Sequence, residues 1–143
     1  MSDSVLYNRE ILRLASSLVA GDRLEHADGT AESRSPVCGS RIQVDVALAS
    51  DGTIAAIALR ANACALGQAS AAILRSNAID AEIATISELR SALAEGLSGK
   101  ADMPTIWPEL ALLAPAKDYP SRHAAILLPY DALLAAAASL SLA

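Results

Sequence analysis

Hydrophobic and polar residues alternate in the middle of the chain, and this pattern predicts strands. From Arg41 to Leu48 apolar side chains occupy every second position, with Arg41, Gln43 and Asp45 on the opposite face of a half-buried strand. The Asp51-Gly52 pair that follows favours a tight turn, because glycine tolerates a positive φ. A second apolar run, Thr53–Ala61, returns from the turn, and its broken alternation at Ala55 leaves room for a bulge. The sequence therefore predicts a β-hairpin.

Elsewhere the apolar residues recur at the three-to-four residue spacing of amphipathic helices. This spacing predicts the following helices: Val5–Ala20, Ala63–Ser76, Asp80–Leu97 as one helix or as two with a break near Thr85, one or two turns at Glu109–Ala114 stopped by Pro115, and Ser121–Leu140 either kinked or restarted at Pro129. The polar stretch Asp22–Ser35 predicts either a short edge strand around Glu25–Thr30 or a mobile segment, and both are compatible with a flap beside Cys38. The expected fold class is α+β, a small three-stranded antiparallel sheet packed against helices.

Composition narrows the class of protein. The 143 residues suffice for one domain, residues 1–143, and the absence of Phe requires a core of Ala, Leu, Ile and Val. A net charge of −5 with scattered basic residues argues against a nucleic-acid surface. The start of the chain shows no signal peptide, and the longest apolar run, Ala132–Leu142, is shorter than a membrane span. We expect a cytoplasmic protein without a nucleic-acid or membrane partner.

The chain contains two cysteines, and each lies at a junction between elements. Cys38 stands between a proline and a glycine just before the first strand, and Cys64 stands between the second strand and a helix. Because a hairpin returns its far end to its near end, we expect both thiols at one edge of the sheet. The N–H groups at a helix start favour the thiolate of Cys64. In a reducing compartment this pattern favours metal or sulfur chemistry, although two inert core cysteines remain the alternative.

Three motifs in order resemble a known family. They are Pro36–Gly39 around the first cysteine, Cys64 at a helix start, and Tyr119–Arg122 ahead of a helix rich in Leu and Ala. This arrangement is similar to the U-type iron–sulfur cluster scaffold proteins, which include IscU, SufU and the amino-terminal domain of NifU. The Glu109–Leu113 segment looks most like the SufU branch. The resemblance extends from Tyr7 to Leu134 and implies a SufE/NifU-like fold.

In that family three cysteines and an aspartate surround one site, which receives sulfur from a cysteine desulfurase and holds a nascent iron–sulfur cluster or zinc. The resemblance carries the first two cysteines onto Cys38 and Cys64. The family's aspartate falls on Ser40 and its third cysteine falls on Ala125, so two of the four ligands are missing here. Two thiolates alone form a weak site for a cluster or for zinc.

His123 lies two positions before Ala125 and could supply a third ligand, with Asp118 or water as a fourth. Alternatively, His123 is an exposed or capping histidine, since a single histidine is weak evidence of metal.

The resemblance implies a scaffold-like protein in iron–sulfur cluster assembly, not an enzyme. Its expected roles are sulfur acceptance at Cys64 and iron or zinc binding by Cys38, Cys64 and His123. The expected partners are a cysteine desulfurase and other assembly proteins. One alternative is a degenerate relative that binds a desulfurase or another assembly partner without holding a cluster. A second alternative is an enzyme with a two-cysteine redox site, which requires the two sulfurs to lie within disulfide reach.

Overall fold

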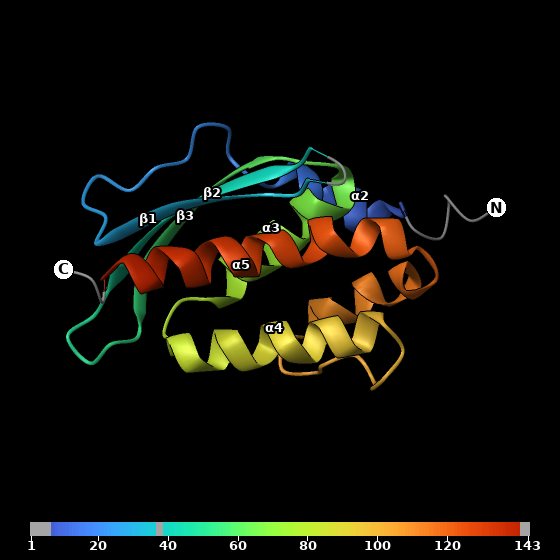
Figure 1. Ribbon diagram of the computed structural model, residues 1–143. Coiled ribbons are helices and arrows are strands. Elements are labelled where there is room, and N and C mark those ends of the chain that lie inside the picture. Colours follow the sequence, from blue (N-terminus) through green and yellow to red (C-terminus); the bar gives the residue numbers. More distant parts are fainter. Residues whose placement is uncertain (1–6, 37–38, 141–143) are drawn as a thin grey trace.

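The computed structural model describes residues 7–36 and 39–140, so Cys38 lies outside the described residues (Figure 1). The helices and strands are α2 (Arg9–Ser16), β1 (Gly29–Arg34), β2 (Arg41–Leu48), β3 (Ile54–Asn62), α3 (Ala65–Asn77), α4 (Ile83–Leu97), the 3-10 helices η1 (Pro108–Asp118) and η2 (Pro120–Arg122), and α5 (His123–Leu140). The three strands form an antiparallel sheet in the order β1-β2-β3. The predicted α+β class is confirmed.

The predicted hairpin is present as β2 and β3. Their register steps from Ala47 opposite Ala56 to Leu48 opposite Ile54, which leaves Ala55 as the extra residue of a bulge at the predicted place. Gly52 has a φ of 88°, as the turn requires. The edge strand β1 begins at Gly29, four residues later than the expected strand around Glu25–Thr30.

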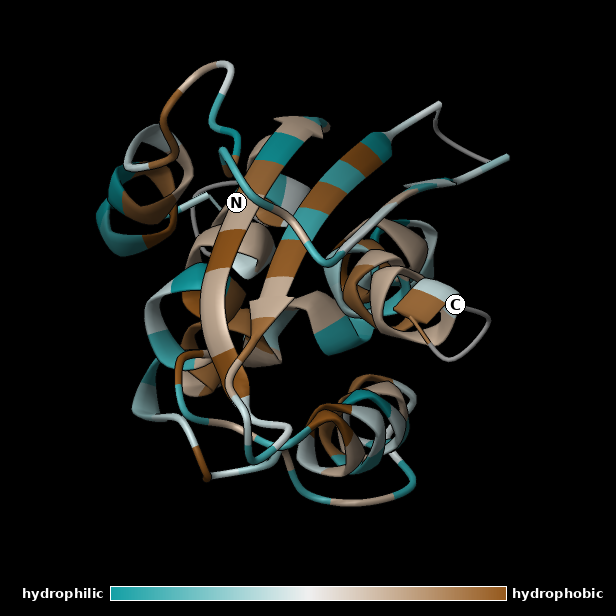
Figure 2. Cartoon of the chain, turned by 90° about the vertical axis from the view of Figure 1, so that its left-hand side faces the viewer, coloured by the Kyte–Doolittle hydropathy of each residue, from teal (hydrophilic) through white to brown (hydrophobic). Residues whose placement is uncertain are grey.

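One face of the sheet carries the core. Ile42, Val44 and Val46 of β2 are fully buried on this face, and Figure 2 shows the alternation as bands along the strands. Helices α3 and α5 cover this face, and α4 packs against α5 on the side away from the sheet (Figure 1). Trp107 is buried beside Tyr130, with ring centroids 6.4 Å apart. Trp107 is therefore a core residue.

Among the described residues, the segment Pro120–Leu140 is long and apolar enough to span a membrane. This segment ends in α5, which contacts β1, β2, α3 and α4. A central core helix passes the same test of length and composition, so the test is weak evidence for a membrane span.

The alternation predicts that Asp45, on the opposite face of the sheet, is exposed to solvent. The structure shows that this part of the face is covered. Asp45 is completely buried, because the segment between α2 and β1 crosses this face. The backbone N–H of Leu24 donates to Asp45 Oδ2 at 3.1 Å, Thr30 Oγ1 donates to Oδ1 at 3.0 Å, and the Arg60 guanidinium donates to both oxygens at 3.1 and 3.2 Å. Burial by itself would raise the pKa of Asp45, but these hydrogen bonds outweigh it and lower the pKa to about 2.

The observed α2 and α4 differ from the predicted helices, and each difference has a local cause. Helix α2 is shorter than Val5–Ala20, and Asn8 caps it, since Asn8 Oδ1 accepts from the N–H of Ile11 at 2.9 Å. Helix α4 runs through Thr85 without a break. The Thr85–Glu88 capping-box pattern therefore lies inside a helix, where it caps nothing.

Two prolines do not end their helices. The 3-10 helix η1 continues through Pro115 to Asp118, and α5 continues as one helix through Pro129. Pro129 has no N–H to donate to the carbonyl of Ala125. The neighbouring carbonyl of Ile126 accepts from the buried Ser70 hydroxyl at 2.6 Å, which ties α5 to α3 at this point.

Candidate functional site: the edge of the sheet at Cys64

The start of β2 and the end of β3 meet at one edge of the sheet. Arg41 pairs with Asn62, which lies two residues before Cys64. The loop between β1 and β2 is closed by its own backbone, since the N–H of Ser35 donates to the Ser40 carbonyl at 2.8 Å and that of Gly39 donates to the Ser35 carbonyl at 3.1 Å. The described end of the loop that contains Cys38 therefore lies beside the end of β3. Cys38 itself is outside the described residues, so it remains a prediction that both thiols lie at this edge.

Cys64 is the N-cap residue of α3, as the sequence predicts. Its backbone is extended (φ −65°, ψ 169°), its carbonyl accepts from the N–H of Gln68 at 2.9 Å, and its side chain makes no capping hydrogen bond. The thiol is free and partly buried, and it packs against the edge of the core. A thiol that is neither disulfide-bonded nor engaged in capping can react with an incoming sulfur group at the positive end of a helix.

Ala125, at the family's third-cysteine position, packs against the first turn of α3. A Cβ atom placed on Gly67 would lie 3.3 Å from the Ala125 carbonyl oxygen and 3.5 Å from its Cβ. Ala125 is 1% exposed. The position thus lies close to Cys64 in the fold, but it offers a buried methyl group in place of a ligand. Ser40, at the family's aspartate position, is also buried.

His123 is held by the backbone of η1. Its Nε2 lies 2.7 Å from the carbonyl oxygen of Ala116, so Nε2 carries the proton and donates it. Only Nδ1 is then left to bind a metal. Within residues 7–36 and 39–140, no group of three or more His, Cys, Asp or Glu side chains could hold a metal ion. The role of His123 as a metal ligand remains a prediction.

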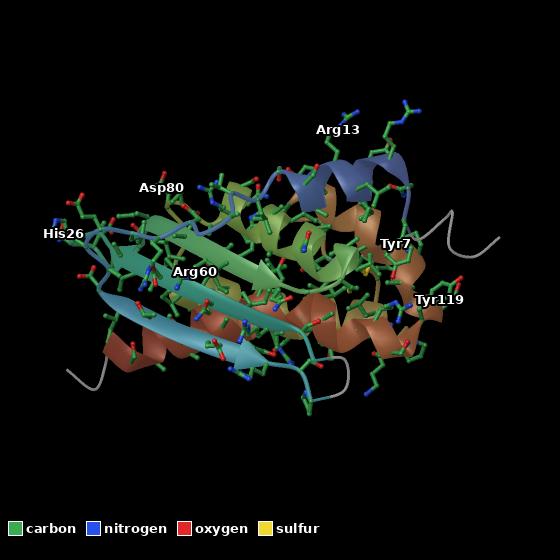
Figure 3. All side chains as sticks on the ribbon, turned by 90° about the horizontal axis from the view of Figure 1, so that it is seen from above. Tyr7, Arg13, His26, Arg60, Asp80 and Tyr119 are labelled. Atoms are coloured by element: carbon green, nitrogen blue, oxygen red, sulfur yellow. The ribbon has the colours of Figure 1, made fainter. Side chains whose placement is uncertain are left out.

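One long-range contact, which the sequence does not predict, joins the beginning of the chain to the Tyr119–Arg122 motif. Arg122 Nε donates to the Tyr7 hydroxyl at 3.0 Å, across 115 residues of sequence. Figure 3 shows Tyr7 and Tyr119 at the same end of the molecule, opposite His26. The motif position of Arg122 marks it as a candidate site residue, but no spacing rule identifies Tyr7 as its partner.

Comparison with known proteins gives structural relatives only. No protein-family model matches the chain, and no curated protein sequence matches it. A nitrogen-fixing NifU-like protein (N-terminal) from Brucella abortus is similar over 99% of this chain and 98% of its own, with 29% identity and a TM-score of 0.91.

Two more solved structures share the fold. An iron–sulfur cluster assembly scaffold protein assigned to the SUF system of the thermophile Fervidobacterium islandicum AW-1 has 19% identity, a TM-score of 0.82 and coverage of 94% of this chain and 98% of its own. A protein described only as hypothetical has 22% identity, a TM-score of 0.81 and the same coverages. At these identities the two likenesses show the fold alone.

The comparisons agree with the sequence motifs. The first relative matches nearly the whole chain in both structure and length, and the motif order Pro36–Gly39, Cys64, Tyr119–Arg122 falls within the matched region. The chain is therefore a structural relative of the NifU-like amino-terminal domain and of SufU, and these findings support its resemblance to the U-type iron–sulfur cluster scaffold family.

Proposed function

We propose that this chain acts in cytoplasmic iron–sulfur cluster assembly, as a scaffold-like protein that accepts sulfur at Cys64. The observation that carries the proposal is the free, partly exposed thiol at the start of α3. It lies in a fold shared with a NifU-like protein and with a protein assigned as an assembly scaffold. Such a protein receives sulfur from a partner and is not itself a turnover enzyme.

The proposed reaction is a thiol–persulfide exchange in which this chain supplies one cysteine thiolate. The Cys64 thiolate attacks the outer sulfur of a persulfide on a cysteine desulfurase; a new S–S bond forms on Cys64, and the desulfurase cysteine leaves as a thiolate. The exchange is balanced and needs no added oxidant. Cys64 is the N-cap residue of α3, where the first backbone N–H groups of the helix have no partner within the helix and can donate to a sulfur group on this residue. Partial burial beside the core limits access to a partner that docks at this edge.

Iron or zinc binding is the second part of the proposal, with Cys38 and Cys64 as thiolate ligands and His123 Nδ1 as a third. The described residues fit a complete four-ligand site poorly. Ala125 offers only a methyl group, and Ser40 offers no anionic oxygen. We therefore assign sulfur acceptance to the chain alone, and we assign stable cluster holding only to a complex in which a partner completes the ligand set.

A second candidate function follows from Ala125 alone. A relative with a buried alanine at the third-ligand position could bind a desulfurase or assembly partner without receiving sulfur. In that case Cys64 has no chemical role and contributes only to packing.

One experiment separates these functions. Full-length protein is incubated with a cysteine desulfurase and radiolabelled cysteine, and the label on the chain is measured after separation without reductant. The proposal expects labelling of the wild type, loss of labelling in Cys64→Ser, and retained binding of that variant to the desulfurase. Retained binding with no label on the wild type supports the second function, and unchanged labelling of Cys64→Ser contradicts the role given to Cys64.

A further inference from the structure

A cavity of about 300 Å³ lies between the end of α2 and the outer face of the sheet, at the same end of the sheet as Cys64. Leu18 and Val19, which follow α2, form an apolar wall. The facing wall is polar and comes from the strands, with Arg41, Gln43 and Asn62 among its residues. This volume is at the lower end of the range for small-molecule sites.

The charges around the cavity favour an anion. Its lining residues include two arginines and no carboxylate. Arg60 is neutralised by Asp45 beneath it, at 3.1 and 3.2 Å, and Figure 3 shows Arg60 on this face of the sheet. Arg41 is exposed, and its side chain forms no hydrogen bond or ion pair within the described ranges. One uncompensated guanidinium therefore faces a cavity on a chain whose net charge is −5.

The amide side chains add donors to this charge. Arg60 Nε donates to Gln43 Oε1 at 3.3 Å, so the free end of the Gln43 amide is its NH₂ group. Gln68 uses one N–H of its amide on the Ala63 carbonyl at 3.0 Å and keeps the other. Asn62 is exposed at the rim. The cavity thus combines a guanidinium with several N–H donors, which suits the two oxygens of a carboxylate.

We propose that this cavity binds a small organic carboxylate with a short aliphatic body. Arg41 holds the carboxylate, Gln43 and Asn62 add hydrogen bonds, and Leu18 and Val19 cover the aliphatic part. The apolar wall favours an organic ligand, because an inorganic ion would lose hydration against this wall without gaining hydrogen bonds from it. The inference does not rest on the proposed function, because none of these residues is a sulfur or metal ligand. Its position does place the ligand near Cys64, two residues beyond Asn62.

The test uses ¹⁵N-labelled full-length protein titrated with butyrate, with butyramide as the neutral isostere and with inorganic phosphate. Butyrate is expected to cause saturable shifts in the side-chain amide signals of Gln43 and Asn62 and in the backbone signal of Gly21. Butyramide is expected to cause none at equal concentration. Arg41→Gln should weaken butyrate binding at least about fivefold, because a charge-assisted hydrogen bond is lost.

Two further variants make the test decisive. Arg13→Gln removes a positive charge from the outward side of α2, away from the cavity, and should bind butyrate as the wild type does (Figure 3). Val19→Asp adds a negative charge at a position that is 58% exposed and should weaken binding without unfolding the protein. Equal responses to butyrate and butyramide, unchanged binding in Arg41→Gln, or a response to phosphate with none to butyrate would each overturn the proposal.

Discussion

Replacing Asp45 with asparagine tests how the segment between α2 and β1 is held on the sheet. The substitution keeps the shape of the side chain but removes its charge. Arg60, whose side chain is 16% exposed, then loses its buried anionic partner. The hydrogen bonds from Leu24 and Thr30 lose a charged acceptor as well. We expect Asp45→Asn to destabilise the protein at neutral pH.

The magnitude follows from the pKa of Asp45. A pKa that falls from 3.8 to about 2 on folding corresponds to roughly 2–3 kcal/mol of stability. Because the pKa of the folded state is the lower one, this contribution is complete above about pH 4. It is lost as the pH falls from about 4 to about 2. Wild type and Asp45→Asn should therefore differ by about 2–3 kcal/mol at pH 7 and converge toward pH 2.

The assay is urea unfolding followed by the fluorescence of Trp107, the one tryptophan of the chain. Asp102→Asn serves as the control, since Asp102 is exposed and makes no ion pair among the described residues, and it should stay within about 0.5 kcal/mol of wild type. A difference below about 0.5 kcal/mol for Asp45→Asn at pH 7, or a difference that stays constant down to pH 2.5, would refute the reasoning.

Three substitutions probe other contacts. Gly29→Ala places a Cβ against the Ala136 carbonyl oxygen of α5, so the free energy of unfolding should fall by about 1–3 kcal/mol, and a change below about 0.5 kcal/mol would contradict this close contact. Tyr130→Phe removes a buried hydroxyl that makes no hydrogen bond within the described part of the chain, where the neighbouring Ser70 hydroxyl donates to the Ile126 carbonyl instead; burial raises the pKa of this phenol. The free energy of unfolding should change by less than about 1 kcal/mol, and a loss above about 2 kcal/mol would show that Ser70 stabilises the phenol. Ala125→Cys supplies a third thiol beside α3 and should raise the zinc retained per chain several-fold in elemental analysis, whereas unchanged zinc would contradict a metal site shared by position 125 and Cys64.

The hairpin and the position of Cys64 are predictable because their signals are local. Alternating side chains define β2, the Asp51-Gly52 pair defines the turn, and the change of period after Asn62 places Cys64 at the start of a helix. The bulge at Ala55 is predictable for the same reason, since only an extra residue reconciles the two apolar runs.

The burial of Asp45 is not predictable from the same alternation. The pattern says that Asp45 faces away from the core, but it cannot say that Leu24, 21 residues earlier, covers that face. The continuation of η1 through Pro115 is not predictable from the sequence, because a proline removes only one hydrogen bond and packing against other helices can outweigh that loss. In α5 the same loss at Pro129 does not divide the helix. The hydrogen bond between Ser70 and Ile126 shows such packing, and it joins residues 56 positions apart.

The most direct test of the central claim locates the transferred sulfur. The wild-type chain is treated with a cysteine desulfurase and cysteine, alkylated without reduction and digested, and the peptides that contain Cys38 and Cys64 are analysed by mass spectrometry. The account predicts an additional sulfur atom on the Cys64 peptide. Additional sulfur on the Cys38 peptide alone, or on neither peptide while the desulfurase turns over, would contradict it.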